Sequence, residues 1–315
     1  MALVMDERRA SLDPPKEPSL ALLGLPTLGL SLSITVLTAL VPLLLQRHTS
    51  SSTLIGAVVS GEGLLALLLP LVLGPLSDRT RSRFGARLPF VMLGTLLGTI
   101  GLAALAFADG VLSLALWVLV FYVGYFAYYP AYRALFPDLV PEQRFGRSQG
   151  VQTIFREVGL ALALVLGPLA FASSRTLPFL VPAAVFALIS IVFVWRITPY
   201  VPRTPPHGSS QSPLALIRRA GPIRRVLLAN ALWELALSSL KTFVVLFVVV
   251  ELGRTPATAS LLFGIIAAIA IIAAPVAGWL ADRFGIVRVL RPALIVYALG
   301  LVLPAFTSSL YVLVP

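Results

Sequence analysis

Charged residues are scarce in this chain of 315 residues: they make up 12%, whereas hydrophobic residues make up 58%. A soluble domain carries roughly 25% charged residues, so a soluble globular fold is excluded. Apolar stretches recur from Leu20 onward at intervals of roughly 30 residues, which fits a spanning helix of ~20 residues plus a short connection. We therefore predict an all-α integral membrane protein with about nine or ten transmembrane helices. The predicted helices cover residues 20–46, 54–76, 88–108, 111–136, 149–172, 177–196, 224–250, 258–280 and 288–307, and residues 308–315 begin a tenth.

Cysteine is absent, and only two histidines are present. Without cysteine the chain can form no disulfide, no thiolate nucleophile and no zinc–thiolate site. His48 and His207 fall in predicted loops on opposite sides of the membrane, so they cannot share a metal ion. A membrane-embedded enzyme needs a nucleophile with its base or a metal cluster, so we expect neither catalysis nor a cofactor.

Basic residues are distributed unevenly along the chain, whose formal net charge is +11. With the N-terminus in the cytoplasm, 18 of the 24 basic residues fall on the cytoplasmic side, and only Arg47, Arg175 and Arg254 fall on the other. This positive-inside pattern predicts a multi-pass plasma membrane protein in contact with lipid, not a nucleic-acid partner. Residues 1–19 are charged and have no apolar core, so they are predicted as a cytoplasmic tail rather than a signal peptide.

A proline-rich connection divides the predicted helices into two groups. Residues 197–222 contain six prolines together with several serines, a composition typical of an extended linker. The predicted organisation is a tail (1–19), a six-helix bundle (20–196), a central cytoplasmic loop (197–222) and a partial second bundle (223–315) with helices seven to nine and the start of ten.

A short motif occurs once in each group of helices. Gly74-Pro-Leu-Ser-Asp78-Arg79 and Gly278-Trp-Leu-Ala-Asp282-Arg283 are offset by 204 residues, and each ends an even-numbered helix at its cytoplasmic face. The glycine lets backbones approach closely, the aspartate can pair at a helix terminus, and the arginine anchors the turn in the cytoplasm. Recurrence at equivalent positions favours a two-state hinge over two ordinary turns.

These motifs resemble the signature of the major facilitator superfamily, which lies between helices two and three and recurs between helices eight and nine. The second copy continues directly to Gly285, whereas the first is stretched through Arg83 and Gly85 to Arg87. The stretched form, together with residues 132–144, resembles the glycoside-pentoside-hexuronide and sucrose transporter-like branches. The resemblance implies that both copies gate two six-helix bundles around a solute cavity that opens alternately to each side.

The resemblance also implies twelve helices, with the first signature loop locked against the eleventh. The chain ends inside an apolar run, at Leu310-Tyr-Val-Leu-Val-Pro315. We therefore expect a fragment with the major facilitator fold, consisting of one six-helix bundle and part of the second.

Glu62 is the candidate for ion coupling. It lies between two glycines, ~13 Å along its predicted helix and thus near the middle of the bilayer. An ionisable side chain at that depth costs ~2.5–3.5 kcal/mol on insertion scales, so it is a functional hypothesis by default. A carboxyl group there can carry H⁺ or help to bind Na⁺. The alternative is a protonated glutamate that hydrogen-bonds to a neighbouring helix.

Two predicted helices each carry a set of polar residues. Arg156 and Glu157 are adjacent and ~100° apart on a helix, so each is predicted to find a partner elsewhere. Both sets are candidates for the solute or ion pathway, and buried structural pairs are the alternative. The two sets are Gln152, Arg156 and Glu157 in residues 149–172, and Asn230, Glu234 and Lys241 in residues 224–250.

An aromatic stripe runs along residues 111–136, which hold five of the eight tyrosines. Tyr122, Phe126, Tyr129 and Arg133 fall within about 60° on one face of the helix. Aromatic rings beside a guanidinium suit a sugar ring or an amphipathic solute. Packing is the alternative for the rings, and snorkelling to the membrane interface is the alternative for Arg133.

Together these features predict a secondary active transporter that moves a small organic solute, such as a sugar or glycoside, by symport with H⁺ or Na⁺. An exporter of amphipathic compounds on the same fold is one alternative. A truncated membrane protein that does not transport is the other.

Overall fold

The computed structural model describes residues 18–80, 82–201, 221, 224–225, 228–232 and 256–302, and these residues are almost entirely helical. No strand occurs in this part of the chain. The elements are α2 (Leu20–Gln46), α3 (Ser52–Arg79), α4 (Leu88–Leu105), α5 (Val111–Leu139), η1 (Glu142–Arg144), α6 (Phe145–Ser173), α7 (Leu177–Ile197), η2 (Thr198–Tyr200), α10 (Pro256–Phe284) and α11 (Ile286–Val302).

Six helices of the described part are long and apolar enough to cross a membrane, and they match the six spans predicted before the linker. α10 and α11 cover the predicted eighth and ninth spans. Most of the predicted seventh span, residues 224–250, lies outside the described residues. The all-α membrane fold with a partial second bundle is therefore confirmed, and the predicted spans agree with the helices to within a few residues at most ends.

Side chains at the helix starts explain several of these boundaries. Ser19 and Ser51 precede α2 and α3, and each hydroxyl accepts a hydrogen bond from a backbone N–H of the first turn. α4 and α7 begin with proline in the first turn, where its missing N–H would have had no helical partner. The sequence thus sets the starts of four spans locally.

Helices α2 to α7 form one bundle with a densely packed aromatic seam between α5 and α7. Tyr128 lies 5.3 Å from Phe186 and Tyr132 lies 5.6 Å from Phe193, measured between ring centroids. All four rings are almost fully buried. Lipid tails are as apolar as these side chains, so van der Waals packing rather than exclusion from water holds such helices together in a bilayer.

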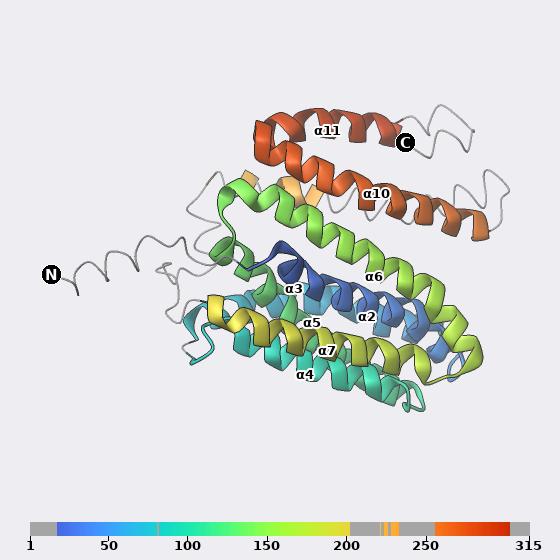
Figure 1. Cartoon of the computed structure of the whole chain (residues 1–315). Helices are drawn as coiled ribbons and strands as arrows, with labels where there is room; N and C mark the ends of the chain where they lie inside the picture. Colours follow the sequence, from blue (N-terminus) through green and yellow to red (C-terminus); the bar gives the residue numbers. More distant parts are fainter. Residues whose placement is uncertain are drawn as a thin grey trace.

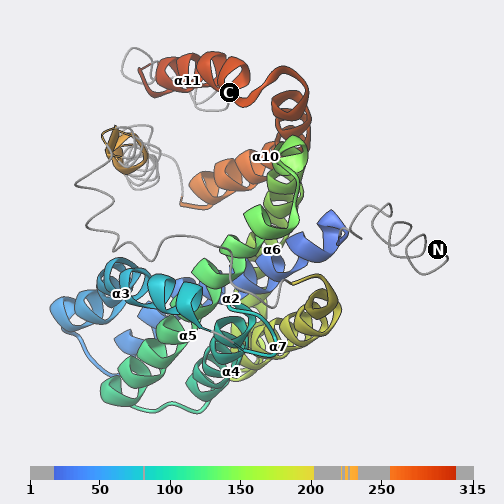
Figure 2. The ribbon, with the colours of Figure 1, turned by 90° about the vertical axis from the view of Figure 1, so that its left-hand side faces the viewer.

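The second group of helices contacts the first bundle through α6. α10 lies along α6 and α11 lies beyond α10, away from the six-helix bundle (Figures 1 and 2). In Figure 1, α6 and α10 meet where α6 begins and separate toward the other end. α6 is therefore the element through which the two groups touch in the described structure.

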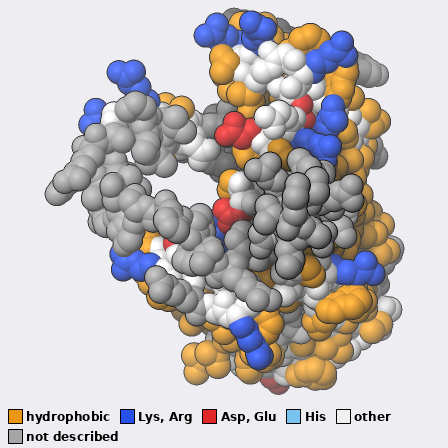
Figure 3. Space-filling view, turned by 60° about the vertical axis from the view of Figure 1, so that its left-hand side comes forward, with side chains coloured by type: hydrophobic (Ala, Val, Ile, Leu, Met, Phe, Trp, Pro, Cys, Tyr) orange, Lys and Arg blue, Asp and Glu red, His pale blue; other side chains and the backbone are white. Residues whose placement is uncertain are grey.

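The two ends of the molecule differ in charge. The end at which α3, α5, α7 and α10 finish and α4, α6 and α11 begin is here called the arginine-rich end. Figure 3 shows basic side chains distributed over this end, with apolar side chains on the flanks. The arginines that define it are Arg79, Arg83, Arg87, Arg144, Arg147, Arg196, Arg283, Arg288 and Arg291.

Candidate solute cavity and inter-bundle contact

A polar cavity of about 130 Å³ lies inside the first bundle, between α2, α5 and α6. Arg133 of α5 reaches across to α6, where its Nη1 donates hydrogen bonds to Gln149 Oε1 at 3.1 Å and Gln152 Oε1 at 2.8 Å. The cavity is lined by Thr27, Leu30, Ser31, Ile34, Tyr125, Tyr129, Arg133, Gln149, Gln152, Thr153 and Arg156. Arg133 thus hydrogen-bonds to the neighbouring helix from an exposed position on the wall of the cavity.

Gln152 is the most deeply buried amide in this cavity, with a relative exposure of 3%. Its oxygen accepts from Arg133, while its Nε2 has no hydrogen-bond partner in the described structure. On the other wall, Ser31 of α2 donates to the backbone oxygen of Arg156 at 2.7 Å. The cavity is thus fixed on both sides by hydrogen bonds between helices.

Arg156 and Glu157 pair with each other, so the prediction that each would find a partner elsewhere is wrong. Arg156 Nη2 lies 2.9 Å from Glu157 Oε1, and its Nε donates to the same oxygen at 3.0 Å. The ~100° between the two Cα–Cβ directions is bridged because the arginine side chain is long enough to fold back beside its neighbour. The carboxylate is 12% exposed, and the adjacent guanidinium is the cation that balances it.

Glu62 accepts a hydrogen bond from the Tyr122 hydroxyl, which lies 3.1 Å from its Oε2. The pair joins α3 to α5, and Tyr122 itself is 2% exposed. Tyr122 lies one turn before Tyr125, which lines the polar cavity. The Glu62 carboxylate is therefore held against α5 one turn from the cavity wall.

The predicted aromatic stripe divides into two parts. Tyr122 and Phe126 are buried and stack at 6.3 Å, so they serve packing. Tyr129 faces the cavity, where its ring stacks on Tyr125 at 5.7 Å with an interplanar angle of 10°. The Arg133 guanidinium lies 6.0 Å from the centre of the Tyr129 ring. A flat aromatic surface beside a cation therefore forms part of the cavity wall.

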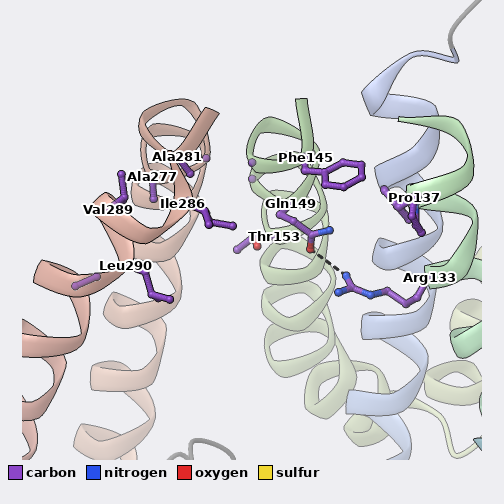
Figure 4. Close-up of a pocket in the computed structure, with 16 residues that line it drawn as sticks. Arg133, Pro137, Phe145, Gln149, Thr153, Ala277, Ala281, Ile286, Val289 and Leu290 are labelled. Atoms are coloured by element: carbon purple, nitrogen blue, oxygen red, sulfur yellow. Dashed lines mark hydrogen bonds between the residues drawn. The ribbon is translucent and has the colours of Figure 1, made fainter. Parts of the chain in front are cut away.

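A wider chamber of about 600 Å³ adjoins the polar cavity and lies between the two groups of helices. Arg133, Gln149 and Thr153 line both spaces, so the two share a wall. Figure 4 shows Arg133 and Gln149 joined by a hydrogen bond, with Ala277, Ile286 and Leu290 across the opening. Apart from those three shared residues, the walls of the chamber are apolar or glycine.

Asp282 joins the two groups of helices at the arginine-rich end. Its Oδ1 accepts from the backbone N–H of Gly146 at 2.7 Å, and its Oδ2 accepts from that of Arg147 at 2.9 Å. Both N–H groups belong to the first turn of α6, where they have no partner within the helix. The positive end of the helix dipole favours a carboxylate there. The carboxylate is only 6% exposed, so the aspartate of the second motif copy is buried against the first bundle.

Two glycines make this approach possible. A Cβ placed on Gly146 would lie 2.2 Å from the backbone oxygen of Gly278, and a Cβ on Gly278 would lie equally close to that of Gly146. No side chain larger than hydrogen fits at either position. Gly278 is the first residue of the repeated motif, and its role here is close backbone approach.

The first copy of the motif has a different setting. Asp78 is 63% exposed and lies 3.7 Å from Arg87, whose Nε also pairs with Asp138 Oδ2 at 2.9 Å. Arg87 therefore ties the ends of α3 and α5 to the start of α4. Gly85 and Gly285, which close the two copies, share a left-handed backbone with φ values of 90° and 88°. This conformation favours glycine at both positions, although the first copy is a longer loop between α3 and α4 and the second has only Gly285 between α10 and α11.

A sequence model described as Major Facilitator Superfamily matches residues 24–315. The chain belongs to the major facilitator superfamily. No curated protein matches the chain in sequence. Superfamily members are typically membrane transporters for small-molecule solutes rather than enzymes, so the chain is a multi-pass membrane protein of this transporter type.

Several residues of this major facilitator cavity were absent from the predicted set. Tyr125 and Thr153 line it, although neither is charged. The sequence contains a signal for both residues, because residues four apart lie on the same face of a helix. Tyr125 precedes Tyr129 by four residues, and Thr153 follows Gln149 by four. Asn230 lies on an exposed helical segment, while Glu234 and Lys241 lie outside the described residues.

Proposed function

We propose that this protein is a secondary transporter that moves a small organic solute by alternating access, with its arginine-rich end in the cytoplasm of the cell that carries it in its plasma membrane. The observation that carries the proposal is the Asp282 contact with the start of α6. It joins the two groups of helices at the arginine-rich end. The chamber lies beside this contact, since Gly146, Gly278 and Ala281 line it, and the polar cavity lies further along α6.

The contact has the strength that a reversible gate needs. A carboxylate at a helix N-terminus contributes about 0.3–2 kcal/mol, so the closed arrangement is favoured without being locked. Opening frees Asp282 and the N–H groups of Gly146 and Arg147 to water, which replaces the lost hydrogen bonds. The left-handed glycine shared by the two motif copies, Gly85 and Gly285, supports a gate with two related halves. Such half-to-half movement is the common mechanism of transporters built from repeats.

Ion coupling is assigned to Glu62. Its carboxyl group lies in a membrane-spanning helix and has one neutral donor, the Tyr122 hydroxyl, at 3.1 Å. Protonation at this position removes a charge from the membrane interior, which makes H⁺ the simplest coupling ion, with Na⁺ as the other candidate. A change of charge near the cavity alters the electrostatic balance between its open and closed forms.

The solute class follows from the cavity walls. Stacked Tyr125 and Tyr129 rings beside Gln149 and Gln152 suit a sugar or glycoside, which presents a flat apolar face and a hydroxylated edge. The second candidate is an exporter of amphipathic compounds. It is favoured by the chamber of about 600 Å³, whose walls are mostly apolar.

Uptake by the reconstituted chain tests the proposal. Proteoliposomes are given an inward gradient of H⁺ or of Na⁺, and accumulation of labelled neutral glycosides, sugar acids and amphipathic aromatic compounds is measured. Gradient-driven accumulation of one class, abolished by an ionophore that dissipates the gradient, is the expected result. If no compound moves faster than through empty liposomes under either gradient, the proposal is wrong.

A further inference from the structure

Two guanidinium groups, Arg133 and Arg156, line the polar cavity, and no carboxylate of the described residues does. Arg156 is balanced by Glu157, which pairs with it at 2.9 Å. Arg133 has no acidic partner within salt-bridge distance in the described structure. The unpaired charge of the described lining is therefore that of Arg133.

The buried Gln152 amide points to what completes the cavity. Its Oε1 already accepts from Arg133, and its Nε2, in a side chain 97% removed from solvent, donates to nothing in the described structure. A buried donor without a partner costs about 1–3 kcal/mol, so native structures pair nearly all of them. An acceptor in this cavity would satisfy the amide and the remaining N–H groups of Arg133 together.

Solutes differ in how well they provide such an acceptor. A neutral sugar hydroxyl can accept from the Gln152 amide, but it carries no charge to pair with Arg133. A carboxylate, sulfonate or phosphate does both, and arginine binds these groups through paired N–H donors. An organic cation is opposed by Arg133, which has no acidic partner among the described residues. The Arg133 guanidinium and the unpaired Gln152 N–H together favour an anion.

The volumes of the two adjoining spaces indicate how large the charged group and the apolar body of the solute can be. A cavity of about 130 Å³ holds a small charged group but not a whole drug-sized molecule, which needs roughly 300 Å³ or more. The adjoining apolar chamber of about 600 Å³ has room for a hydrocarbon or aromatic body. The stacked rings of Tyr125 and Tyr129 line the polar cavity and offer a flat surface to such a body.

We propose that the transported solute is a small amphipathic organic anion, whose charged group binds Arg133 and Gln152 in the polar cavity while its apolar body occupies the chamber. This assignment rests on the proposed transport function and replaces its neutral glycoside with an anionic solute. The same chemistry is presented by a free organic acid and by the headgroup of an anionic lipid. We assign the cavity to the free acid, because the Gln152 amide, to which Arg133 donates, is only 3% exposed between α5 and α6.

Binding of matched probes tests the assignment. The full chain in phosphatidylcholine nanodiscs is titrated with 1-naphthoate and with its neutral counterpart 1-naphthamide, and affinity is measured by calorimetry. Naphthoate is expected to bind at least ~10-fold more tightly, the difference made by one charge-assisted hydrogen-bonded pair. Equal affinities would overturn the assignment. Loss of naphthoate binding on adding phosphatidylglycerol to the nanodiscs would also overturn it, in favour of a lipid headgroup.

Three variants test whether naphthoate binds in the polar cavity. R133Q is expected to lower naphthoate affinity by ~10-fold or more, whereas R196Q, which removes an exposed arginine at the end of α7, leaves it unchanged. Q152E places a carboxylate beside Arg133 with almost no change of shape. It should abolish naphthoate binding while raising thermal stability, a result that a misfolded variant cannot give. Unchanged naphthoate affinity in both R133Q and Q152E would overturn the assignment.

The outcomes separate this assignment from the transport proposal. If naphthoate binds in an Arg133-dependent way but no solute is taken up under a gradient, the anion site is supported and the transport proposal is wrong. If a neutral glycoside is taken up under a gradient and naphthoate binds no better than naphthamide, the transport proposal is supported and the anion assignment is wrong.

Discussion

Asp282 at the end of α10 accepts a hydrogen bond from the backbone N–H of Gly146 at the start of α6, 2.7 Å away. This contact crosses between the two groups of helices and uses a carboxylate from the repeated motif. It gives the second motif copy a definite partner, the N-terminus of a helix in the other bundle. The gate proposed for this major facilitator protein depends on it.

Replacing Asp282 with asparagine should weaken the closed arrangement. The amide retains the shape but loses the charge that favours the helix N-terminus, which is worth about 0.3–2 kcal/mol or roughly a two- to thirty-fold change in the ratio of open to closed forms. Because the chain has no cysteine, a single Thr153→Cys variant reports on access to the cavity. Labelling by a membrane-impermeant maleimide from the arginine-rich side should become faster in Asp282→Asn.

The matched control for this experiment is Asp109→Asn. Asp109 is 80% exposed and pairs with His48 and Arg175 at the opposite end of the bundle. Its replacement should leave the labelling rate of Thr153→Cys unchanged. An equal acceleration by both variants would mean that the Asp282 contact does not control access.

Gly146→Ala and Gly278→Ala should each open the same contact by steric means. A methyl group at either position would lie 2.2 Å from a backbone oxygen of the other helix, so the helices must move apart. The two changes act on one contact, so the double variant should be no more open than the more open single variant. Gly56→Ala is the control, because nothing lies within 4 Å of its added methyl group. Additive effects on Thr153→Cys labelling would show that the two glycines act separately.

Glu62→Gln should abolish ion-driven accumulation while leaving exchange of solute across the membrane. The amide keeps a hydrogen-bond acceptor for Tyr122 but can neither release a proton nor offer a charged ligand to Na⁺. Accumulation and counterflow are measured in the same proteoliposomes, with Glu142→Gln, an exposed site in η1, as the control. Undiminished accumulation in Glu62→Gln would remove this carboxyl group from coupling.

Arg87→Gln should destabilise the first bundle. Arg87 and Asp138 are 12% and 17% exposed and pair at 2.9 Å, so the change leaves a largely buried carboxylate without its cation. The expected loss is about 1–3 kcal/mol, seen as a lower midpoint of thermal unfolding in detergent. Arg87→Gln combined with Asp138→Asn should recover part of it, because no unpaired charge remains. A single variant as stable as the original chain would show that the pair contributes nothing.

Local sequence patterns predicted the helices well and their side-chain partners less well. Apolar runs bounded by serine, proline and arginine placed α2 to α7 to within a few residues, because each span depends mainly on its own composition. The repeated motif marked Asp282 as important, but its partner is a pair of backbone N–H groups 135 and 136 residues away in sequence. Backbone partners carry no residue signature, so only the folded structure reveals them.

Side-chain flexibility limited the predictions within the membrane. The facing directions of Arg156 and Glu157 on an ideal helix suggested separate partners, yet two long side chains bridge that angle and pair. Arg133 was compatible with snorkelling or with a cavity, since both place an arginine one turn from a helix end. In the structure its side chain hydrogen-bonds to Gln149 and Gln152 on the adjacent helix, a partner choice that the spacing within its own helix could not reveal.

The most direct test of the account is the distance between the two groups of helices at the arginine-rich end. Spin labels on Gln143→Cys and Arg288→Cys, both exposed positions, report it in proteoliposomes, and a pair at Gln143 and Trp195 within the first bundle is the control. The account predicts two distances for the first pair, with populations that shift when the ion gradient or Asp282→Asn is introduced, and one constant distance for the control. A single, invariant distance for the first pair would contradict alternating access.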